Sequence, residues 1–444
     1  MIEKIIEGSA RNTFLVVLFI AFTTAVGWWA LQKTPLDAIP DLSDVQVIIF
    51  SEWPGRAPQI IEDQITYPIV TTMLGAPKVK VVRGFSYFGL SFVYVIFQDG
   101  TDMYWARSRV LEYMNEAAKF LPAEVTPTLG PDATGVGWGF EYALVDTTGK
   151  RDLSELRTLQ DWYLRYWLKA VPGVSDVASI GGYVKQYQVN LDPNALLAYN
   201  LPLDKIINAI RMSNNDVGGR VVEFTGREYM VWGQGYLQSV EDIEQIALGT
   251  DKRGTPILLK DVARVELGPD SRRGFVELDG KGEVVGGIVV IRFGESTLEV
   301  IERVKAKIEE VTPALPEGVQ IVPTYDRSDL IYQSVETLKE KLIEESVIVS
   351  LVTIIFLFHF RSALVAILTL PLAILMSLTA MHFLGVSSNI MSLGGIAIAI
   401  GAMIDGAIVM VENAHKKLEQ AKPGTDRVTV LIESAKEVGK PLFY

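Results

Sequence analysis

The sequence predicts an α+β membrane protein, in which transmembrane helices flank a large block of alternating strands and helices. Three observations support this prediction. The 444-residue chain has a mean hydropathy of +0.25, which is high for a soluble protein, and its apolar residues concentrate at the two ends. The long middle segment alternates between strand-like and helical patterns of hydrophobicity. One uncharged run near the N-terminus is long enough to cross a bilayer.

The first predicted span covers residues 14–31, an uncharged run that reads FLVVLFIAFTTAVGWWAL. Lys4 and Arg11 precede this run, and Trp28 and Trp29 lie near its far end, as interfacial anchors do. A cleaved signal peptide is the alternative, but its apolar core would be shorter and would end in small residues. We therefore expect an uncleaved helix, with residues 1–32 forming this span and a short cytoplasmic segment before it.

Three further spans are expected within residues 337–413. Their apolar runs cover residues 346–360, 362–384 and 389–411, and the first of these should begin inside the preceding helix near Leu342. The positive-inside rule then places the basic residues of the N-terminus and of the short loops in the cytoplasm. The segment from residue 33 to about residue 341 consequently lies outside the cytoplasm.

The C-terminal segment, residues 414–444, is expected to form a helix on the cytoplasmic side of the membrane. Its sequence ends abruptly in KPLFY after a helical-looking stretch. This ending predicts a chain that is truncated before its next span.

The composition excludes several classes of protein. A net charge of -12 and a pI near 5.0 argue against a nucleic-acid-binding protein, whose surface would be basic. The chain has no cysteine, which excludes disulfides, zinc–thiolate sites and thiol catalysis. Its three histidines all lie in the last third, so neither an imidazole-rich metal site nor an extracytoplasmic Ser-His-Asp hydrolase is expected. The eleven methionines are the only soft ligands.

The extracytoplasmic block contains two units with the same order of elements. The first unit has strands and helices in the order β-α-β-β-α, at residues 45–50, 57–74, 79–83, 90–97 and 102–120. This order matches the ferredoxin-like (βαββαβ) motif. A second unit of the same kind begins with a strand at residues 138–146 and is interrupted by a turn-rich insert. We therefore divide the block into three parts: residues 33–132, residues 133–180 with 274–336, and the insert at residues 181–273.

The last predicted span contains a carboxylate, Asp405, in the stretch GGIAIAIGAMIDGAIVMVE. A charge at this depth costs about 2.5–3.5 kcal/mol on insertion scales, which argues for a function. Glu412 lies seven residues later and therefore on the same helical face. Burial raises the pKa of a carboxylate, so we predict a proton relay at Asp405 and a weaker role for Glu412. The alternative is a structural aspartate that is hydrogen-bonded to a neighbouring helix.

Two methionines, Met403 and Met410, are also seven residues apart and share a face roughly opposite Asp405. Thioether ligands select soft monovalent ions such as Cu(I) and Ag(I). Methionine is also a common filler of apolar helices. The spacing alone leaves both interpretations open.

The order of the segments resembles half of a resistance-nodulation-division (RND) pump. The stretch GGIAIAIGAMIDGAIVMVENAHK is similar to the fourth span of the heavy-metal efflux branch, and most similar to the Cus-type copper/silver exporters. The motifs DAIPDLSDVQVIIF, FQDGTDMYWARSRVLEYMNEA, RTLQDW and LVAILTLPLAI extend this resemblance over essentially the whole chain.

The resemblance implies a homotrimer in the bacterial inner membrane, with a large periplasmic domain and subunits about twice as long as this chain. Such a pump is driven by proton influx, has no permanently bound cofactor, and joins a periplasmic adaptor (membrane fusion) protein and an outer-membrane channel. Its transported ion would be Cu(I) or Ag(I). Residues 33–132 would be the first porter subdomain, the split unit the second, and the insert the docking subdomain.

The resemblance also implies specific roles for residues of the fourth span. Met391, Met403 and Met410 match methionines of a metal relay, and Asp405 matches the proton-carrying aspartate, whose charged partners lie on spans outside this chain. Ser271, however, stands where the copper/silver exporters have a periplasmic methionine, which leaves the ion open. The alternatives are an exporter of divalent zinc, cobalt, nickel or cadmium, or an RND-like protein that assists protein or lipid translocation.

Overall fold

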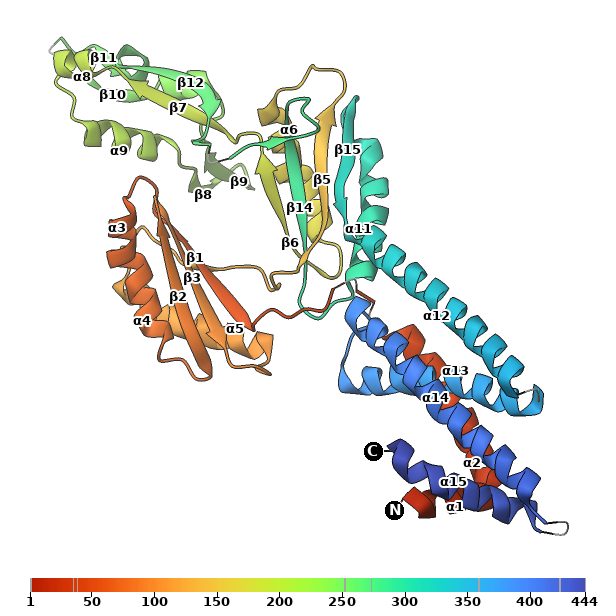
Figure 1. Ribbon diagram of the computed structural model, residues 1–444. Coiled ribbons are helices and arrows are strands. Elements are labelled where there is room, and N and C mark those ends of the chain that lie inside the picture. The colour runs from red at the N-terminus through yellow and green to blue at the C-terminus, as the bar shows by residue number, and fades with distance from the viewer. Residues whose placement is uncertain are drawn as a thin grey trace.

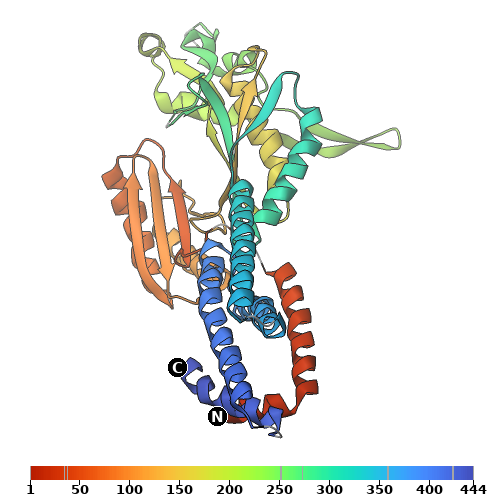
Figure 2. The same cartoon turned by 45° about the vertical axis from the view of Figure 1, so that its right-hand side comes forward.

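The computed structural model describes residues 2–34, 36–37, 39–250, 253–272, 274–357, 360–422 and 425–443. The molecule is elongated, with a group of long helices at one end, two separate α+β units, and an outer subdomain at the far end (Figure 1). The two termini lie together at the helical end, where α1 (Ile2–Arg11) contacts α15 (Arg427–Phe443) (Figure 2).

Four long helices form the helical end: α2 (Thr13–Lys33), α12 (Arg327–Leu357), α13 (Phe360–Leu384) and α14 (Ile390–Gln420). Among the described residues, α2 and α14 are long and apolar enough to cross a membrane, and within α13 a shorter apolar stretch covers Leu368–Leu384. The first half of α12 is rich in charged residues. This composition explains why α12 does not meet the same criterion.

Two of these helices extend beyond their apolar runs. As predicted, the apolar run that follows Leu342 continues from a preceding amphipathic helix, and the whole of α12 begins at Arg327, since no helix-breaking residue separates the two parts. The last helix passes residue 411 and ends at Gln420. Polar residues of its final turns still favour a helix, since Lys, Glu and Gln have high helix propensity.

The start of α14 is fixed by a reciprocal cap. The Asn389 side-chain oxygen accepts hydrogen bonds from the backbone N–H groups of Met391 and Ser392, both at 3.0 Å. The Ser392 hydroxyl in turn accepts from the N–H of Asn389 at 2.9 Å. Gly385, at φ +70°, ends α13 four residues earlier. These caps define the short loop that separates the two helices.

The first α+β unit contains a four-stranded antiparallel sheet in the order β2-β3-β1-β4. Its strands are β1 (Gln46–Glu52), β2 (Val79–Tyr87), β3 (Leu90–Phe97) and β4 (Thr128–Leu129). One face is covered by α3 (Pro58–Ile61), a π-helical turn (Glu62–Thr66), α4 (Tyr67–Met73) and α5 (Met103–Ala117). Alternate strand residues such as Val47, Ile49, Val93 and Val95 form the core beneath these helices.

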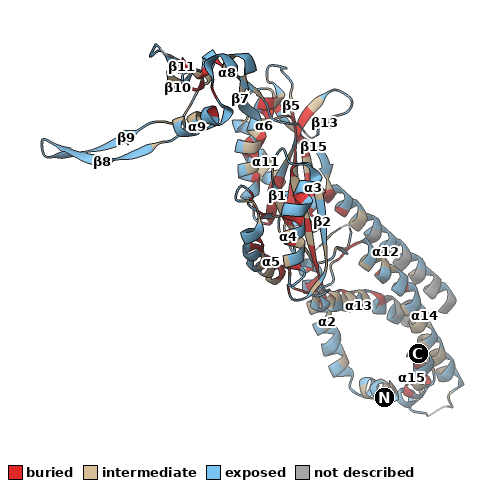
Figure 3. Ribbon diagram, turned by 90° about the vertical axis from the view of Figure 1, so that its left-hand side faces the viewer, coloured by how far each residue is buried: buried red, intermediate tan, exposed pale blue. Residues whose placement is uncertain are grey.

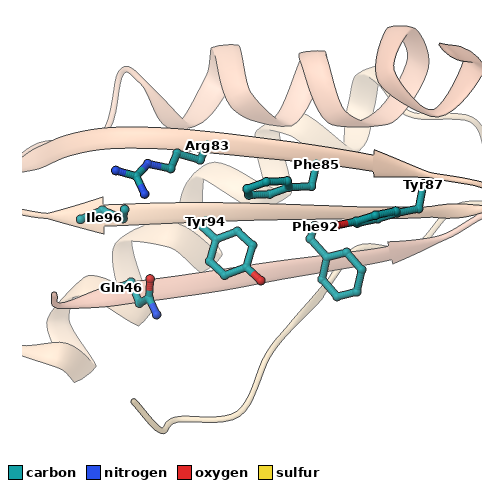
Figure 4. Close-up of a pocket in the computed structure, with 7 residues that line it drawn as sticks. All are labelled: Gln46, Arg83, Phe85, Tyr87, Phe92, Tyr94 and Ile96. Atoms are coloured by element: carbon teal, nitrogen blue, oxygen red, sulfur yellow. The ribbon is translucent and has the colours of Figure 1, made fainter. Parts of the chain in front are cut away.

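The opposite face of this sheet is aromatic (Figure 4). Its side chains surround a shallow hollow of about 530 Å³ and come from Gln46, Arg83, Phe85, Tyr87, Phe92, Tyr94 and Ile96. Phe85 packs edge-to-face on Tyr94, and Tyr87 does the same on Phe92, with ring centroids 5.5 and 5.9 Å apart.

The second unit has a five-stranded sheet built from two distant parts of the chain. Its strands are β5 (Trp138–Asp146), β6 (Val174–Gly181), β13 (Val276–Glu277), β14 (Glu283–Ile291) and β15 (Val319–Asp326). The order is β13-β14-β5-β15, and β6 also pairs with β14. The covering helices are α6 (Leu153–Leu159), a π-helical turn (Gln160–Leu164), α7 (Arg165–Lys169) and α11 (Thr297–Val311). The last strand, β15, is followed directly by α12.

The outer subdomain lies between β6 and β13 in sequence. Strand β7 (Lys185–Leu191) pairs antiparallel with β12 (Ala263–Pro269), and β10 (Ala247–Thr250) pairs with β11 (Pro256–Leu258). Helices α8 (Pro193–Tyr199), α9 (Leu203–Ser213) and α10 (Val240–Glu244) complete a separate small core. A hairpin of β8 (Val217–Phe224) and β9 (Arg227–Gly233) projects away from it, with every residue exposed (Figure 3).

Candidate functional site

Helix α14 places Met403 and Met410 on the wall of one apolar cavity. This cavity has a volume of about 740 Å³ and lies between α14, α13, α15 and α1. Met403 also packs against a small buried cluster formed by Leu370, Leu378, Ile396 and Ile400. The two thioethers therefore share an environment that is lined mainly by apolar side chains from several helices.

The two methionines cannot hold one ion together. Seven residues of α-helix separate them, which corresponds to about 10.5 Å along the axis. Metal–sulfur bonds are about 2.3 Å long, so each thioether could serve only as a separate ligand position. His415 also lines this cavity, and its Nε2 atom lies 3.3 Å from Glu419 Oε1. No carboxylate belongs to the described lining of the cavity.

Met391 lies apart from this cavity. It occupies the first turn of α14, where 67% of the residue is exposed. Twelve residues, or about 18 Å of helix, separate it from Met403. Within this chain, Met391 could therefore provide only a separate ligand position, near the amino-terminal end of α14 and away from Met403 and Met410.

The two acidic candidates, Asp405 and Glu412, lie on a different face of α14 from the cavity, and both are exposed. We expected Asp405 to be buried. Among the described residues it is not, because its face is open there: nothing lies within 4 Å of a Cβ built at Gly394 or Gly401, which share that face of α14. In the described part of the chain, no side-chain hydrogen bond or ion pair joins Asp405 to another residue.

Ser271 is far from these candidates. It lies in the exposed segment between β12 and β13, and its N–H donates to Asp270 Oδ1 at 2.7 Å. Among the described residues, no group of three or more His, Asp or Glu side chains is placed to hold a metal ion.

A polar cluster centred on Asp132 joins the two α+β units. Asp132 accepts hydrogen bonds from the hydroxyls of Ser175 and, at 3.3 Å, of Tyr104, and it forms an ion pair with Arg292 at 3.0 Å. Partial burial acts to raise the pKa of Asp132, but the Ser175 hydrogen bond and the Arg292 charge outweigh it, so its pKa is lowered. Asp132 is therefore an anionic link between α5 of the first unit and the sheet of the second.

An ion pair between a buried arginine and a partly exposed aspartate, which the sequence patterns do not reveal, lies where the helices meet the second unit. Arg327 is 3% exposed, and its Nη2 atom is 2.9 Å from Asp37 Oδ1. The two residues are almost 300 positions apart, and although Asp37 begins the motif DAIPDLSDVQVIIF, nothing in that motif indicates Arg327 as its partner. Only their positions, just after the first span and at the start of the second long helix, could have indicated such a pair.

The fold and the comparisons define the class of protein. Two crystal structures of a heavy metal efflux pump match 99% of this chain, with TM-scores of 0.84 and 0.83 and sequence identities of 33% and 32%. The matched part is 43% of the length of those chains. The profile of the AcrB/AcrD/AcrF family matches residues 6–443. The chain therefore belongs to this family, which confirms the RND family predicted from its motifs.

Curated relatives extend the match over the whole chain. The putative cation efflux system protein SilA of Salmonella typhimurium is 55% identical over 451 residues, and the cation efflux system protein CusA of Escherichia coli K12 is 53% identical. The cobalt-zinc-cadmium resistance protein CzcA of Cupriavidus metallidurans is 37% identical over 458 residues. In each case the alignment covers all of this chain but 43% of the relative, so the chain spans less than half the length of these proteins.

Proposed function

We propose that this chain is the amino-terminal part of a proton-driven RND transporter that exports Cu(I) or Ag(I). The observation that carries this proposal is the apolar cavity in which Met403 and Met410 lie without any carboxylate among the described lining residues. A soft monovalent ion binds well to thioethers in such a setting, whereas divalent zinc or cobalt prefers oxygen and imidazole ligands, of which the described lining offers the single imidazole of His415 and no carboxylate. The names of relatives more than half identical to this chain, which denote cation efflux systems, support export as the direction.

The three methionines would act as successive positions along α14. Their axial spacings of about 10.5 and 18 Å prevent two of them from sharing one ion within this helix. Each would therefore need further ligands from other helices of the full-length subunit. Met391, near the extracytoplasmic end, would be the last of the three positions on an outward path.

Asp405 would carry the proton whose inward movement drives export, with Glu412 in a weaker role. Two features support the separation of the two pathways: the carboxylates and the thioethers occupy different faces of α14, and the relatives are long enough to supply helices for the open face. A membrane-embedded carboxylate is expensive without a function.

We further propose the arrangement of the chain in the cell envelope. Helices α2, α12, α13 and α14 would cross the bacterial inner membrane, and the block from residue 33 to 336 would lie in the periplasm. The strand orders β2-β3-β1-β4 and β6-β14-β5-β15 support two ferredoxin-like porter subdomains, with the outer subdomain as the docking element. The full-length protein would form a homotrimer with a periplasmic adaptor and an outer-membrane channel.

Isosteric replacement of the methionines tests the proposed ion. In the full-length pump, Met391→Ile, Met403→Ile and Met410→Ile keep volume and apolarity, so unfolding free energy should change by about 1 kcal/mol or less. Copper and silver tolerance of a strain without other exporters should nevertheless fall. Met381→Ile is the matched control, because Met381 packs against the same cluster from α13 but lies outside the cavity lining.

The outcomes separate the alternatives. Normal copper and silver export by all three variants would reject the thioether pathway. Loss of zinc or cobalt tolerance upon gene deletion, with copper tolerance unchanged, would instead support the divalent exporter, to which the 37%-identical relative also points.

A further inference from the structure

The junction between the helices and the second α+β unit is organised around Arg327. This residue is the first of α12 and follows the last residue of β15 directly. Its Nη1 atom donates to the carbonyl of Val136, in the segment before β5, at 2.5 Å. Its Nη2 atom forms the ion pair with Asp37. A single guanidinium thus connects α12, the second unit and the linker that follows α2.

Asp37 extends the connection in two further directions. Its Oδ2 atom accepts a hydrogen bond from the Thr297 hydroxyl, in the first turn of α11, at 2.9 Å. Its backbone N–H donates to the carbonyl of Ser388 at 3.0 Å, and Leu36 forms a parallel β-bridge with Ser388. Ser388 immediately precedes Asn389, the residue that caps α14. The linker is therefore attached on one side to the second unit and on the other to the start of α14.

The amino-terminal end of α12 has a further contact with the second unit. Lys305 of α11 forms an ion pair with Asp326 at 2.5 Å and donates to the Ser328 hydroxyl at 2.8 Å. Burial acts to raise the pKa of Asp326, but the Lys305 and Ser328 hydrogen bonds lower it overall, so Asp326 stays anionic. The contacts of Asp326 and Ser328 therefore hold Arg327, which lies between them, in one position. In that position its guanidinium reaches Asp37.

We propose that Asp37 and Arg327 are positioning residues that keep the amino-terminal end of α14 in fixed register with the second α+β unit. This inference rests on the proposed function, in which α14 carries Asp405. A change in α14 when Asp405 gains or loses its proton reaches Ser388, passes through the Leu36–Asp37 backbone and the ion pair, and moves the second unit. The Asp37–Arg327 ion pair stays formed throughout the transport cycle. We call this permanent connection between α14 and the second unit the tie.

The burial of Arg327 makes this role specific, since 4% of its side chain is exposed against 21% of that of Asp37. Removal of Asp37 leaves the buried guanidinium without its charge partner, which is far more disruptive than loss of an exposed pair. The pair also joins segments that are distant in sequence, unlike the i,i+3 pairs along α12. Lys339 and Glu336 form such a pair at 3.2 Å, with about 60% of each side chain exposed, and provide a matched control within the same helix.

The first test measures coupling in the full-length pump in proteoliposomes. Arg327→Gln and Asp37→Asn should each lower silver-driven proton flux at least tenfold, while silver binding and trimer content stay within twofold of wild type. Arg327→Lys, which keeps the charge, should recover most of the flux. The proton flux of the double variant should be no lower than that of either single variant, because each single substitution already breaks the same ion pair. Lys339→Gln should be normal.

Proton flux within twofold of wild type in Arg327→Gln would overturn the proposal. A double variant whose fold-loss of flux equals the product of the two single losses would overturn it too. A structural role alone would lower assembly and silver binding together with flux. That result would also overturn it.

A cross-link provides a second test that does not depend on these variants folding. This chain has no cysteine, so Leu36→Cys with Ser388→Cys, in a full-length pump from which any further cysteine has been removed, gives a defined pair across the β-bridge. Oxidation should leave silver-driven flux within twofold of the reduced protein, because the tie stays closed. A loss of flux that a reductant reverses would show that these segments must separate, and would reject the tie.

Hydrogen exchange separates failure of the tie from failure of the proposed transport function. If wild-type pump shows no copper- or silver-driven proton flux, the proposed function is wrong, whatever the variants do. The tie still predicts that Arg327→Gln accelerates exchange of two amides at least tenfold: that of Asp37, which donates to the Ser388 carbonyl, and that of Leu393, which donates to the Asn389 carbonyl at 2.9 Å in the first turn of α14. Lys339→Gln should accelerate neither. Unchanged exchange at both amides would reject the tie independently of any substrate.

Discussion

Gly27 of α2 lies directly against the backbone of Leu375 in α13. A Cβ atom built at position 27 would be 2.6 Å from Leu375 Cβ and 2.9 Å from its carbonyl oxygen. Contacts this short leave no room for any side chain, and the atoms that would have to move belong largely to the backbone. The close approach of α2 and α13 therefore depends on glycine at this position.

Gly27→Ala should destabilise the full-length protein by about 1–3 kcal/mol, because the two helices must separate to admit the methyl group. Thermal unfolding in detergent, followed by the loss of helical signal, would measure this effect. Gly8→Ala is the control, since nothing lies within 4 Å of the place that a Cβ atom would take at this position of α1. That variant should be neutral or more stable, as alanine favours helix over glycine by about 1 kcal/mol. Equal unfolding temperatures for the two variants would contradict the packing argument.

Acid should weaken the turn after β5 through Asp146. Hydrogen bonds from the Thr148 hydroxyl and the Arg151 backbone N–H lower the pKa of Asp146 from 3.8 to about 2. Because the folded-state pKa is depressed, the stabilisation is fully present above about pH 4 and is lost as the pH falls toward 2. Wild type should unfold at a higher temperature than Asp146→Asn at pH 6, and the difference should vanish near pH 2.

Asp63→Asn, at an exposed position of the first unit, is the control for this pH series. It should change the unfolding temperature little at any pH. A difference between wild type and Asp146→Asn that stays constant from pH 6 to pH 2 would exclude titration of Asp146 as the cause.

The strands were the most predictable elements of the fold. The ranges expected for β3 and β5 from the sequence coincide with the observed Leu90–Phe97 and Trp138–Asp146. Both strands are rich in β-branched and aromatic residues and adjoin glycine-containing turns, so local signals are sufficient. The start of α12 could not be placed in this way. Its first residue, Arg327, pairs with Asp37 almost 300 residues away, and a local pattern carries no information about that partner.

The candidate site shows the same division. The shared face of Met403 and Met410 follows from helical periodicity, and the structure places both on one cavity. Their cavity also requires α1 and α15 from the two ends of the chain, which periodicity cannot bring together. The environment of Asp405 was not predictable, because its face of α14 is left open by every described helix of this chain.

A buried polar pair in the second unit gives a prediction of non-additivity. The Tyr142 hydroxyl donates to Gln160 Oε1 at 2.8 Å, and both residues are 1% exposed or less. Tyr142→Phe should cost about 1–3 kcal/mol of unfolding free energy, because the amide oxygen is left without its donor. Gln160→Leu in the Tyr142→Phe background should recover part of this loss, since neither polar group then remains buried. A double variant whose cost equals the sum of the single variants would show that the bond contributes nothing specific.

The proton role of Asp405 predicts a loss of transport without a loss of folding. In the full-length pump, Asp405→Asn keeps the size of the side chain but cannot exchange a proton, so silver-driven proton flux should fall by about a hundredfold or more, the scale of removing an acid–base group. Trimer content and unfolding temperature should remain unchanged, because no described side chain of this chain pairs with Asp405.

Glu412→Gln should have a smaller effect, and Glu433→Gln, at an exposed position on α15, should have none. Silver binding by Asp405→Asn should also persist, since the thioethers lie on a different face of α14. Normal copper and silver resistance in cells that carry Asp405→Asn would remove this carboxylate from the transport mechanism.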